Sequence, residues 1–135
     1  MARLILDTGV LIAGVRGRLD LGALADADDV AIPAIAVAEY LAGVFLDPAS
    51  DRASAQRAFL ADVLAVVPVK DYDIDIAEQH AWLLAHTHRT GTRRGTHDLI
   101  VAATARATDR IVLTTDERAR FADLPEVRVR LASRT

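Results

Sequence analysis

A short apolar run that ends at a carboxylate constrains the fold of this chain more than any other feature. Residues 4–6 are Leu-Ile-Leu, and Asp7 and Thr8 follow directly. Such a run, bounded by a turn signal, is typical of a parallel strand covered on both faces. Open α/β sheets bind ligands outside the carboxyl ends of their strands, so Asp7 is expected where chemistry is usually done. The alternative is that Asp7 or Thr8 only caps a helix that starts near Val10.

The same pattern recurs late in the chain. Residues 111–113 are Ile-Val-Leu, and Thr114, Thr115 and Asp116 follow. If the two runs are neighbouring parallel strands, Asp7 and Asp116 emerge on one edge of the sheet. Further strands are expected at 30–32, 66–69 and 127–129, and helices at 10–13, 19–27, 35–45, 50–63, 73–86, 98–105 and 117–121. This alternation predicts the α/β class, with a central, mostly parallel sheet of four to five strands flanked by helices.

Two further acids stand in helical contexts. Glu39 is the only charge in the apolar helix expected at 35–45. An ionised carboxylate is rarely buried in such a helix unless it is paired or binds a metal. Asp98 lies in the first turn of a helix whose small residues allow close approach to a sheet. The alternatives are that Glu39 lies at the helix edge and reaches water, and that Asp98 serves as a cap.

Composition limits the class of protein. With 135 residues, 52% of them hydrophobic, the chain is expected to form a single domain over 1–135. It has no Cys, which excludes thiolate chemistry, Cys-ligated zinc and disulfides and suits a cytoplasmic protein. No apolar run approaches the ~20 residues of a membrane span, and the N-terminus does not resemble a signal peptide. The net charge of −3 argues against a uniformly basic nucleic-acid surface, but it is compatible with a local basic groove.

Carboxylates gathered at one edge of a sheet repel one another unless protons or a divalent cation offset their charge. Mg²⁺ fits, with Mn²⁺ as a substitute, because both ions prefer carboxylate and water oxygens. Such a site suits phosphodiester hydrolysis. Other phosphate chemistries are disfavoured: residue 9 is Gly rather than the second Asp of a haloacid-dehalogenase-type phosphatase, and Lys70, the only Lys, does not suit a response-regulator receiver. The sequence also lacks a Gly-rich phosphate loop.

Four segments, taken in order, resemble the acidic motifs of PIN-domain ribonucleases, most closely those of the VapC toxins of VapBC toxin–antitoxin modules. They are Leu4-Ile5-Leu6-Asp7-Thr8-Gly9-Val10-Leu11-Ile12, Ala38-Glu39-Tyr40-Leu41, Thr96-His97-Asp98-Leu99-Ile100-Val101-Ala102-Ala103 and Leu113-Thr114-Thr115-Asp116. The resemblance spans nearly the whole chain and implies a PIN-like three-layer fold. One departure concerns the fourth motif, where many relatives carry Asn and an aromatic residue four positions later. Here Asp116 takes that place, and Phe121 comes five positions later.

The resemblance also implies an activity and its residues. It implies an Mg²⁺-dependent endoribonuclease that is inhibited by a VapB-like antitoxin, whose C-terminal segment lies across the site. The catalytic and metal-binding acids would be Asp7, Glu39, Asp98 and Asp116, with Thr8 and Thr115 in support.

A basic, glycine-punctuated stretch at 86–96 runs directly into Asp98 and is expected to be a surface loop. We expect RNA phosphates to be held by arginines of this loop and by two later ones: Arg89, Arg93, Arg94, Arg118 and Arg120. The alternative is a solvated connector. His80, His86 and His88 lack the spacing of a zinc helix and are expected to be solvated or to cap helices.

Two other functions stay open on the sequence: a non-catalytic PIN-like module that binds RNA or protein, and a DNA nuclease of similar fold. Clustered negative charge near phosphates argues against a pure binder, and the resemblance alone favours RNA over DNA. We also expect a homodimer with no membrane contact. Residues 35–59 hold more apolar side chains than one sheet face can cover, which leaves Val44, Phe45 and Leu46 for a protein interface.

Overall fold

The structure is a computed structural model, and it describes residues 1–132 apart from the side chain of Arg118. The expected RNA contact of Arg118 therefore lies outside the described residues. Within the described part of the chain, no helix is long and apolar enough to cross a bilayer.

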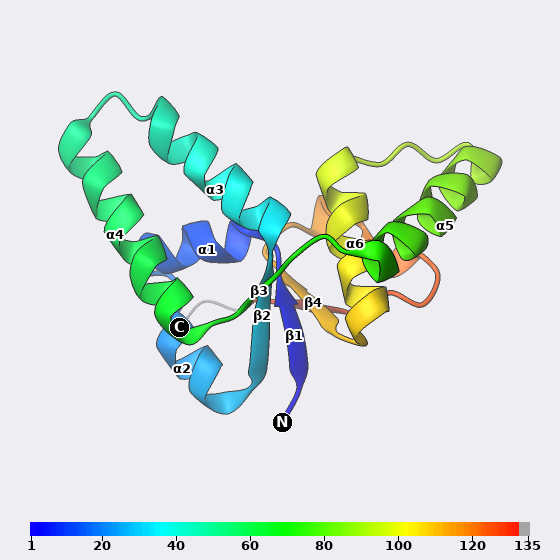
Figure 1. Cartoon of the computed structure of the whole chain (residues 1–135), viewed down its shortest axis with the longest axis horizontal. Coiled ribbons are helices and arrows are strands. Elements are labelled where there is room, and N and C mark those ends of the chain that lie inside the picture. The colour runs from blue at the N-terminus through cyan, green and yellow to red at the C-terminus, as the bar shows by residue number, and fades with distance from the viewer. Residues whose placement is uncertain (133–135) are drawn as a thin grey trace.

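A five-stranded sheet, parallel throughout, forms the centre of the protein (Figure 1). The strands are β1 (Arg3–Leu6), β2 (Asp29–Pro33), β3 (Val69–Lys70), β4 (Ile111–Thr114) and β5 (Val129–Leu131), in the order β3-β2-β1-β4-β5. The predicted α/β class and parallel sheet are confirmed. In particular, β1 and β4 are neighbours, with Leu6 opposite Leu113. The strands that carry Asp7 and Asp116 therefore end side by side.

Helices cover both faces of this sheet, which gives the three layers expected. They are α1 (Thr8–Val15), α2 (Leu21–Ala27), α3 (Ala34–Leu46), α4 (Ser50–Val66), α5 (Ile74–Thr90) and α6 (Thr96–Thr108). Successive side chains of a strand point to opposite faces. Leu4 and Leu6 therefore pack in one core with α1 to α4, and Ile5 packs in the other with α5 and α6. The two groups of helices spread from the sheet as two arms (Figure 1).

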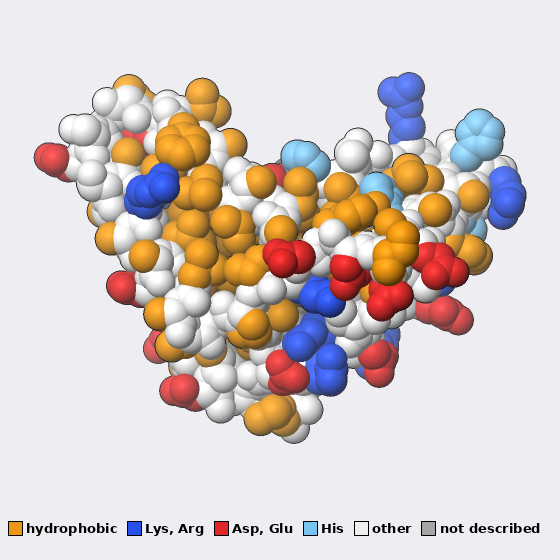
Figure 2. Space-filling model, viewed as in Figure 1, with side chains coloured by type: hydrophobic (Ala, Val, Ile, Leu, Met, Phe, Trp, Pro, Cys, Tyr) orange, Lys and Arg blue, Asp and Glu red, His pale blue; other side chains and the backbone are white. Residues whose placement is uncertain are grey.

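The sequence of 35–45 is apolar almost all round, which predicts a buried helix, and this prediction is wrong for one side of α3. Its buried side chains include Tyr40 and Val44, whereas Phe45 is 73% exposed and Leu46 is 82% exposed. The reason is that α3 and α4 form a hairpin that projects from the sheet, so one side of α3 has no layer above it (Figure 1). Val44 faces the core and is not an interface candidate, which corrects one of the three residues that we expected at a protein interface. Figure 2 shows apolar side chains gathered over this arm.

Several predicted boundaries also move. Helix α5 continues through His86 to Thr90, so half of the expected basic loop is helical, and it ends at Gly91 with a φ of 67°. Helix α4 runs to Val66, which shortens the strand predicted at 66–69 to the two residues of β3. The helix expected at 117–121 is instead two short 3-10 turns, η1 (Glu117–Ala119) and η2 (Phe121–Asp123), with Arg120 between them at a φ of 52°.

Candidate active site

Asp7 directly follows β1 and is almost completely buried, with 8% of its surface exposed. Its Oδ1 accepts a hydrogen bond of 2.8 Å from the backbone N–H of Thr8, which is the capping role that the sequence left open. Its Oδ2 accepts a second bond, of 3.0 Å, from the hydroxyl of Thr114. Capping therefore accounts for one oxygen of Asp7, and β4 holds the other.

Thr114 connects two of the acids, and the sequence reasoning missed it. Its Oγ1 donates to Asp7 and also accepts a 3.0 Å hydrogen bond from the backbone N–H of Asp116. The strand register was the signal that could have found it, because pairing Leu6 with Leu113 puts Thr114 opposite Asp7. Thr115, which was expected to support the site, is exposed, and its Oγ1 lies 2.3 Å from where a Cβ on Gly9 would stand.

Glu39 lies in the second turn of α3, and its side chain is 31% exposed. Its Oε1 accepts a 2.9 Å hydrogen bond from the Thr8 hydroxyl, so Thr8 does support an acid in this structure. Its Oε2 lies 3.1 Å from Nδ1 of His97. Glu39 is thus neither deeply buried nor free in water. The sequence offered His97 no role, because nothing local places it beside a residue 58 positions earlier in the chain.

Asp98 stands in the first turn of α6, after the N-cap residue Gly95. Burial raises the pKa of the Asp98 carboxyl above its ordinary value of 3.8, and the charges of Asp7, Asp116 and Glu39 raise it further, while His97 opposes the change. A nearby negative charge disfavours a second ionised carboxylate, so this mutual effect shows that the four acids lie within electrostatic reach.

The pKa of the Asp7 carboxyl is also raised. Burial raises its pKa, and the charges of Glu39 and Asp116 add to the increase, while the hydrogen bonds from Thr114 and from the Thr8 N–H oppose it. The four acids come from the end of β1, from α3, from α6 and from the turn after β4. The structure therefore brings together residues that the sequence spreads over more than a hundred positions.

The chemistry of this donor set fits a hard divalent cation. Within residues 1–132, no three His, Asp or Glu side chains already stand close enough to hold one ion. That arrangement is compatible with Mg²⁺, because the ion usually keeps several waters and takes one or two carboxylates together with substrate phosphates. Such an ion would offset the electrostatic repulsion between the acids. Metal binding at these residues stays a prediction.

The described arginines that were expected to bind RNA differ in position and in exposure. Arg93 is exposed on the loop between α5 and α6, whereas Arg89 belongs to the last turn of α5. Arg94 is partly buried and uses Nη1 on two backbone carbonyls. Arg120 pairs with Asp123 at 2.7 Å. A cavity of 390 Å³ has Asp98 and three of these arginines among its lining residues. The arginines are Arg93, Arg94 and Arg120. Basic side chains therefore do stand beside one of the acids.

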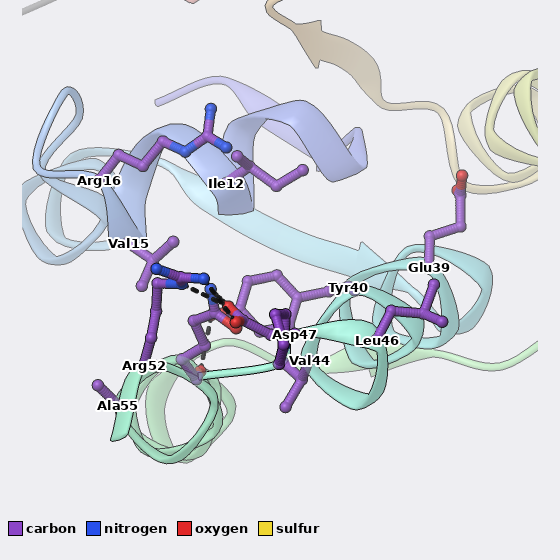
Figure 3. Close-up of a pocket in the computed structure, with 13 residues that line it drawn as sticks. Ile12, Val15, Arg16, Glu39, Tyr40, Val44, Leu46, Asp47, Arg52 and Ala55 are labelled. Atoms are coloured by element: carbon purple, nitrogen blue, oxygen red, sulfur yellow. Dashed lines mark hydrogen bonds and ion pairs between the residues drawn. The ribbon is translucent and has the colours of Figure 1, made fainter. Parts of the chain in front are cut away.

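A second, larger cavity of 730 Å³ lies between α1 and the α3–α4 hairpin (Figure 3). Ile12 of α1 lies across it from Tyr40 of α3. Glu39 stands at one end, apart from the ion pair of Asp47 with Arg52, whose atoms are 2.6 Å apart. A mainly apolar channel therefore leads along α3 to an acid of the site.

Comparisons with known proteins agree with this fold. The chain is 27% identical over 126 residues to "Ribonuclease VapC" of Rickettsia bellii, a match that covers 93% of each protein. It is 30% identical to a chain of VapBC-5, a member of the VapBC family of toxin–antitoxin systems from Mycobacterium tuberculosis, with a TM-score of 0.76 and coverage of 98% and 99%. The fold also matches a chain of VapBC2 from Rickettsia felis bound to a promoter DNA fragment, with a TM-score of 0.84 at 20% identity and coverage of 96% and 98%.

The family model of the PIN domain matches residues 4–127, which run from β1 to just before β5 and include all four acids. The order of the acids, the parallel sheet and this match all point the same way: the chain belongs to the PIN-domain family.

Proposed function

We propose that this protein is a metal-dependent endoribonuclease and the toxin of a toxin–antitoxin pair. The observation that carries the proposal is the gathering of four carboxylates at the carboxyl edge of the sheet, where hydrogen bonds orient Asp7 and Glu39; burial raises the pKa of Asp7 and Asp98 there, and neighbouring charges add to the increase. Perturbed carboxylates that gather at a topological edge are the usual sign of a catalytic site. The similarity to a protein named Ribonuclease VapC supports RNA as the substrate.

The chain's own residues prepare this site. Thr114 and the Thr8 N–H hold Asp7 in one orientation, and the Thr8 hydroxyl holds Glu39. The cation would be held by Asp7 and Asp98, with Asp116 and Glu39 close by. When bound, Mg²⁺ or Mn²⁺ would lower the pKa of a water and offset charge at the phosphorus. Because Asp7 and Glu39 are already held in place, these two side chains need little reorganisation when the substrate arrives.

The basic cavity beside Asp98 suits the RNA backbone. Arg93 is exposed there, and its guanidinium can bind a phosphate through two parallel hydrogen bonds. Positive charge at this place offsets the repulsion between the acids and an approaching phosphate. Arg93 is therefore the arginine that we favour for RNA binding.

The channel along α3 suits the antitoxin. The structural relatives include toxin–antitoxin complexes, and the channel combines apolar walls with Glu39 at one end. An amphipathic or extended peptide buries apolar anchors in such a groove. A segment that lies there would reach Glu39 and block the site. Leu46 lines the channel, and its neighbour in sequence, Phe45, is 73% exposed, so both add apolar surface that a partner could cover.

Cleavage of a total-RNA pool tests the activity. We expect wild-type protein to cut RNA with Mg²⁺ and not with EDTA, and to leave single-stranded DNA intact. Asp98→Asn should be inactive, while Asp109→Asn should keep full activity because it makes the same charge change at the far end of α6. RNA that stays whole with Mg²⁺ would favour the binding-module alternative, and cleavage of DNA instead would favour the DNA nuclease.

A further inference from the structure

Arg94 joins the two segments that carry Asp98 and Asp116. It lies in the loop just before α6, four residues ahead of Asp98. Its Nη1 donates hydrogen bonds of 2.7 Å to the carbonyl oxygens of Ala119 and Arg120. These carbonyls follow Asp116 by three and four residues. One guanidinium group therefore ties the start of α6 to the turn after β4.

The turn that Arg94 holds is strained. Arg120 adopts a φ of 52°, a left-handed conformation that is unfavourable for a residue other than glycine and persists when surrounding contacts enforce it. The ion pair of Arg120 with Asp123 joins side chains that are 72% and 48% exposed, and such a pair contributes little. The charge-assisted bonds from Arg94 to this peptide are stronger. The buried side chains of Phe121 and Leu124 anchor this turn in the core, and Arg94 adds hydrogen bonds that tie its backbone to the loop before α6.

The site itself pushes these two segments apart. The fold brings the carboxylates of Asp98, in the first turn of α6, and Asp116, after β4, to the same edge of the sheet, and like charges repel. Asp116 is bound to Thr114 through its backbone N–H, and the first 3-10 turn, η1, begins at the next residue, Glu117. Without Arg94, this turn would lose its two hydrogen bonds to the loop before α6, and the repulsion would act on a strained backbone.

The geometry points to Arg94 as a positioning residue: by binding the carbonyls of Ala119 and Arg120, it sets where Asp116 stands relative to Asp98. This inference rests on the proposed function for its effect on catalysis. It separates Arg94 from Arg93, its neighbour in sequence and its equal in charge, although the sequence suggested one shared role in RNA binding. Because Nη1 of Arg94 is bound to the two carbonyls and Nε is buried, the guanidinium is held in the turn rather than presented to a phosphate.

The adjacent arginines make a matched pair for kinetics. Arg94→Ala should lower kcat for RNA cleavage about 10–100-fold with little change in KM, as is usual when a group that orients metal ligands is lost. Arg93→Ala should raise KM and reduce the salt slope of RNA binding by about one unit, with kcat unchanged. Arg94→Lys should recover much of the lost kcat, because an ammonium group can still donate to both carbonyls.

Hydrogen exchange on the metal-free protein gives a readout that needs no activity. Amides of residues 115–124 should exchange faster in Arg94→Ala than in wild type, and at wild-type rates in Arg93→Ala. If Arg94→Ala does not fold, Arg94→Met, which keeps the apolar stem of the side chain but donates no hydrogen bond, decides the matter through the same two measurements.

The outcomes separate the two proposals. Exchange and kcat at wild-type levels in Arg94→Ala would overturn the positioning role, and so would an increase in KM with kcat unchanged, which marks a phosphate contact. If the wild-type protein cuts no RNA, the proposed function fails, and faster exchange at 115–124 in Arg94→Ala would still establish the tie.

Discussion

Replacing Thr114 by valine removes two hydrogen bonds from the site while it keeps the shape of the side chain. The lost bond to the buried, ionised carboxylate of Asp7 is worth about 1.5–3 kcal/mol. The backbone N–H of Asp116 also loses its acceptor, at a cost of about 1 kcal/mol. We therefore expect Thr114→Val to lower the free energy of unfolding by about 2.5–4 kcal/mol at pH 7 without metal, a large share of a typical domain's stability.

Thr104→Val is the matched control. Both threonines are 1% exposed, and both lose one hydroxyl to a methyl group. Thr104 donates to the carbonyl of Ile100 one turn earlier in its own helix, and such bonds add little to stability. Its loss should cost less than about 1 kcal/mol. Urea unfolding of both variants measures the difference, and equal losses would refute the assignment of Thr114 as the support of Asp7.

The pH dependence carries a second check. Burial raises the folded-state pKa of Asp7 above 3.8, so the stability that Asp7 contributes is present at low pH and is lost as the pH rises through that raised pKa. The Thr114 bond opposes the increase, and its removal raises the pKa further. The defect of Thr114→Val should thus be largest at neutral pH and should shrink as acid protonates Asp7. A defect independent of pH would contradict this reasoning.

Three further predictions follow from other contacts. Asp98→Asn should weaken Mg²⁺ binding in a metal titration, yet leave the free energy of unfolding at pH 7 unchanged or higher, because one repelling charge is gone. If this variant cleaves RNA at the wild-type rate, Asp98 is only a cap. Gly9→Ala should destabilise the protein by about 1 kcal/mol, because the new Cβ would clash with Thr115 Oγ1. Adding Thr115→Ala should remove that loss in a double-mutant cycle of urea unfolding, and a coupling energy of zero would exclude the clash. The double change of Phe45 and Leu46 to Ser should alter stability by less than about 0.5 kcal/mol but weaken antitoxin binding in calorimetry and any homodimer in light scattering; unchanged association would remove this surface from both interfaces.

Much of the fold was predictable because the signals are local. An apolar run that stops at an acid reports a buried strand and its carboxyl end, and these signals located β1 and β4 together with Asp7 and Asp116. The prediction for α3 was wrong because apolar residues on all sides of a helix do not say how many neighbours will cover it. The helix α5 ran past its predicted end because His88 and Arg89 suit the last turn of a helix as well as they suit a loop.

What the sequence by itself determined is the set of acids and the elements that present them, because each depends on residues within one strand or one helical turn. The tertiary structure alone decided which side chains meet. The order β2-β1-β4 places Asp7 beside Thr114. The packing of α3 near α6 brings Glu39 to His97. The fold of the last turns directs the Arg94 guanidinium to backbone carbonyls. These contacts join residues that are 25 to 107 positions apart, and their energies exist only once the chain has closed the loops between them.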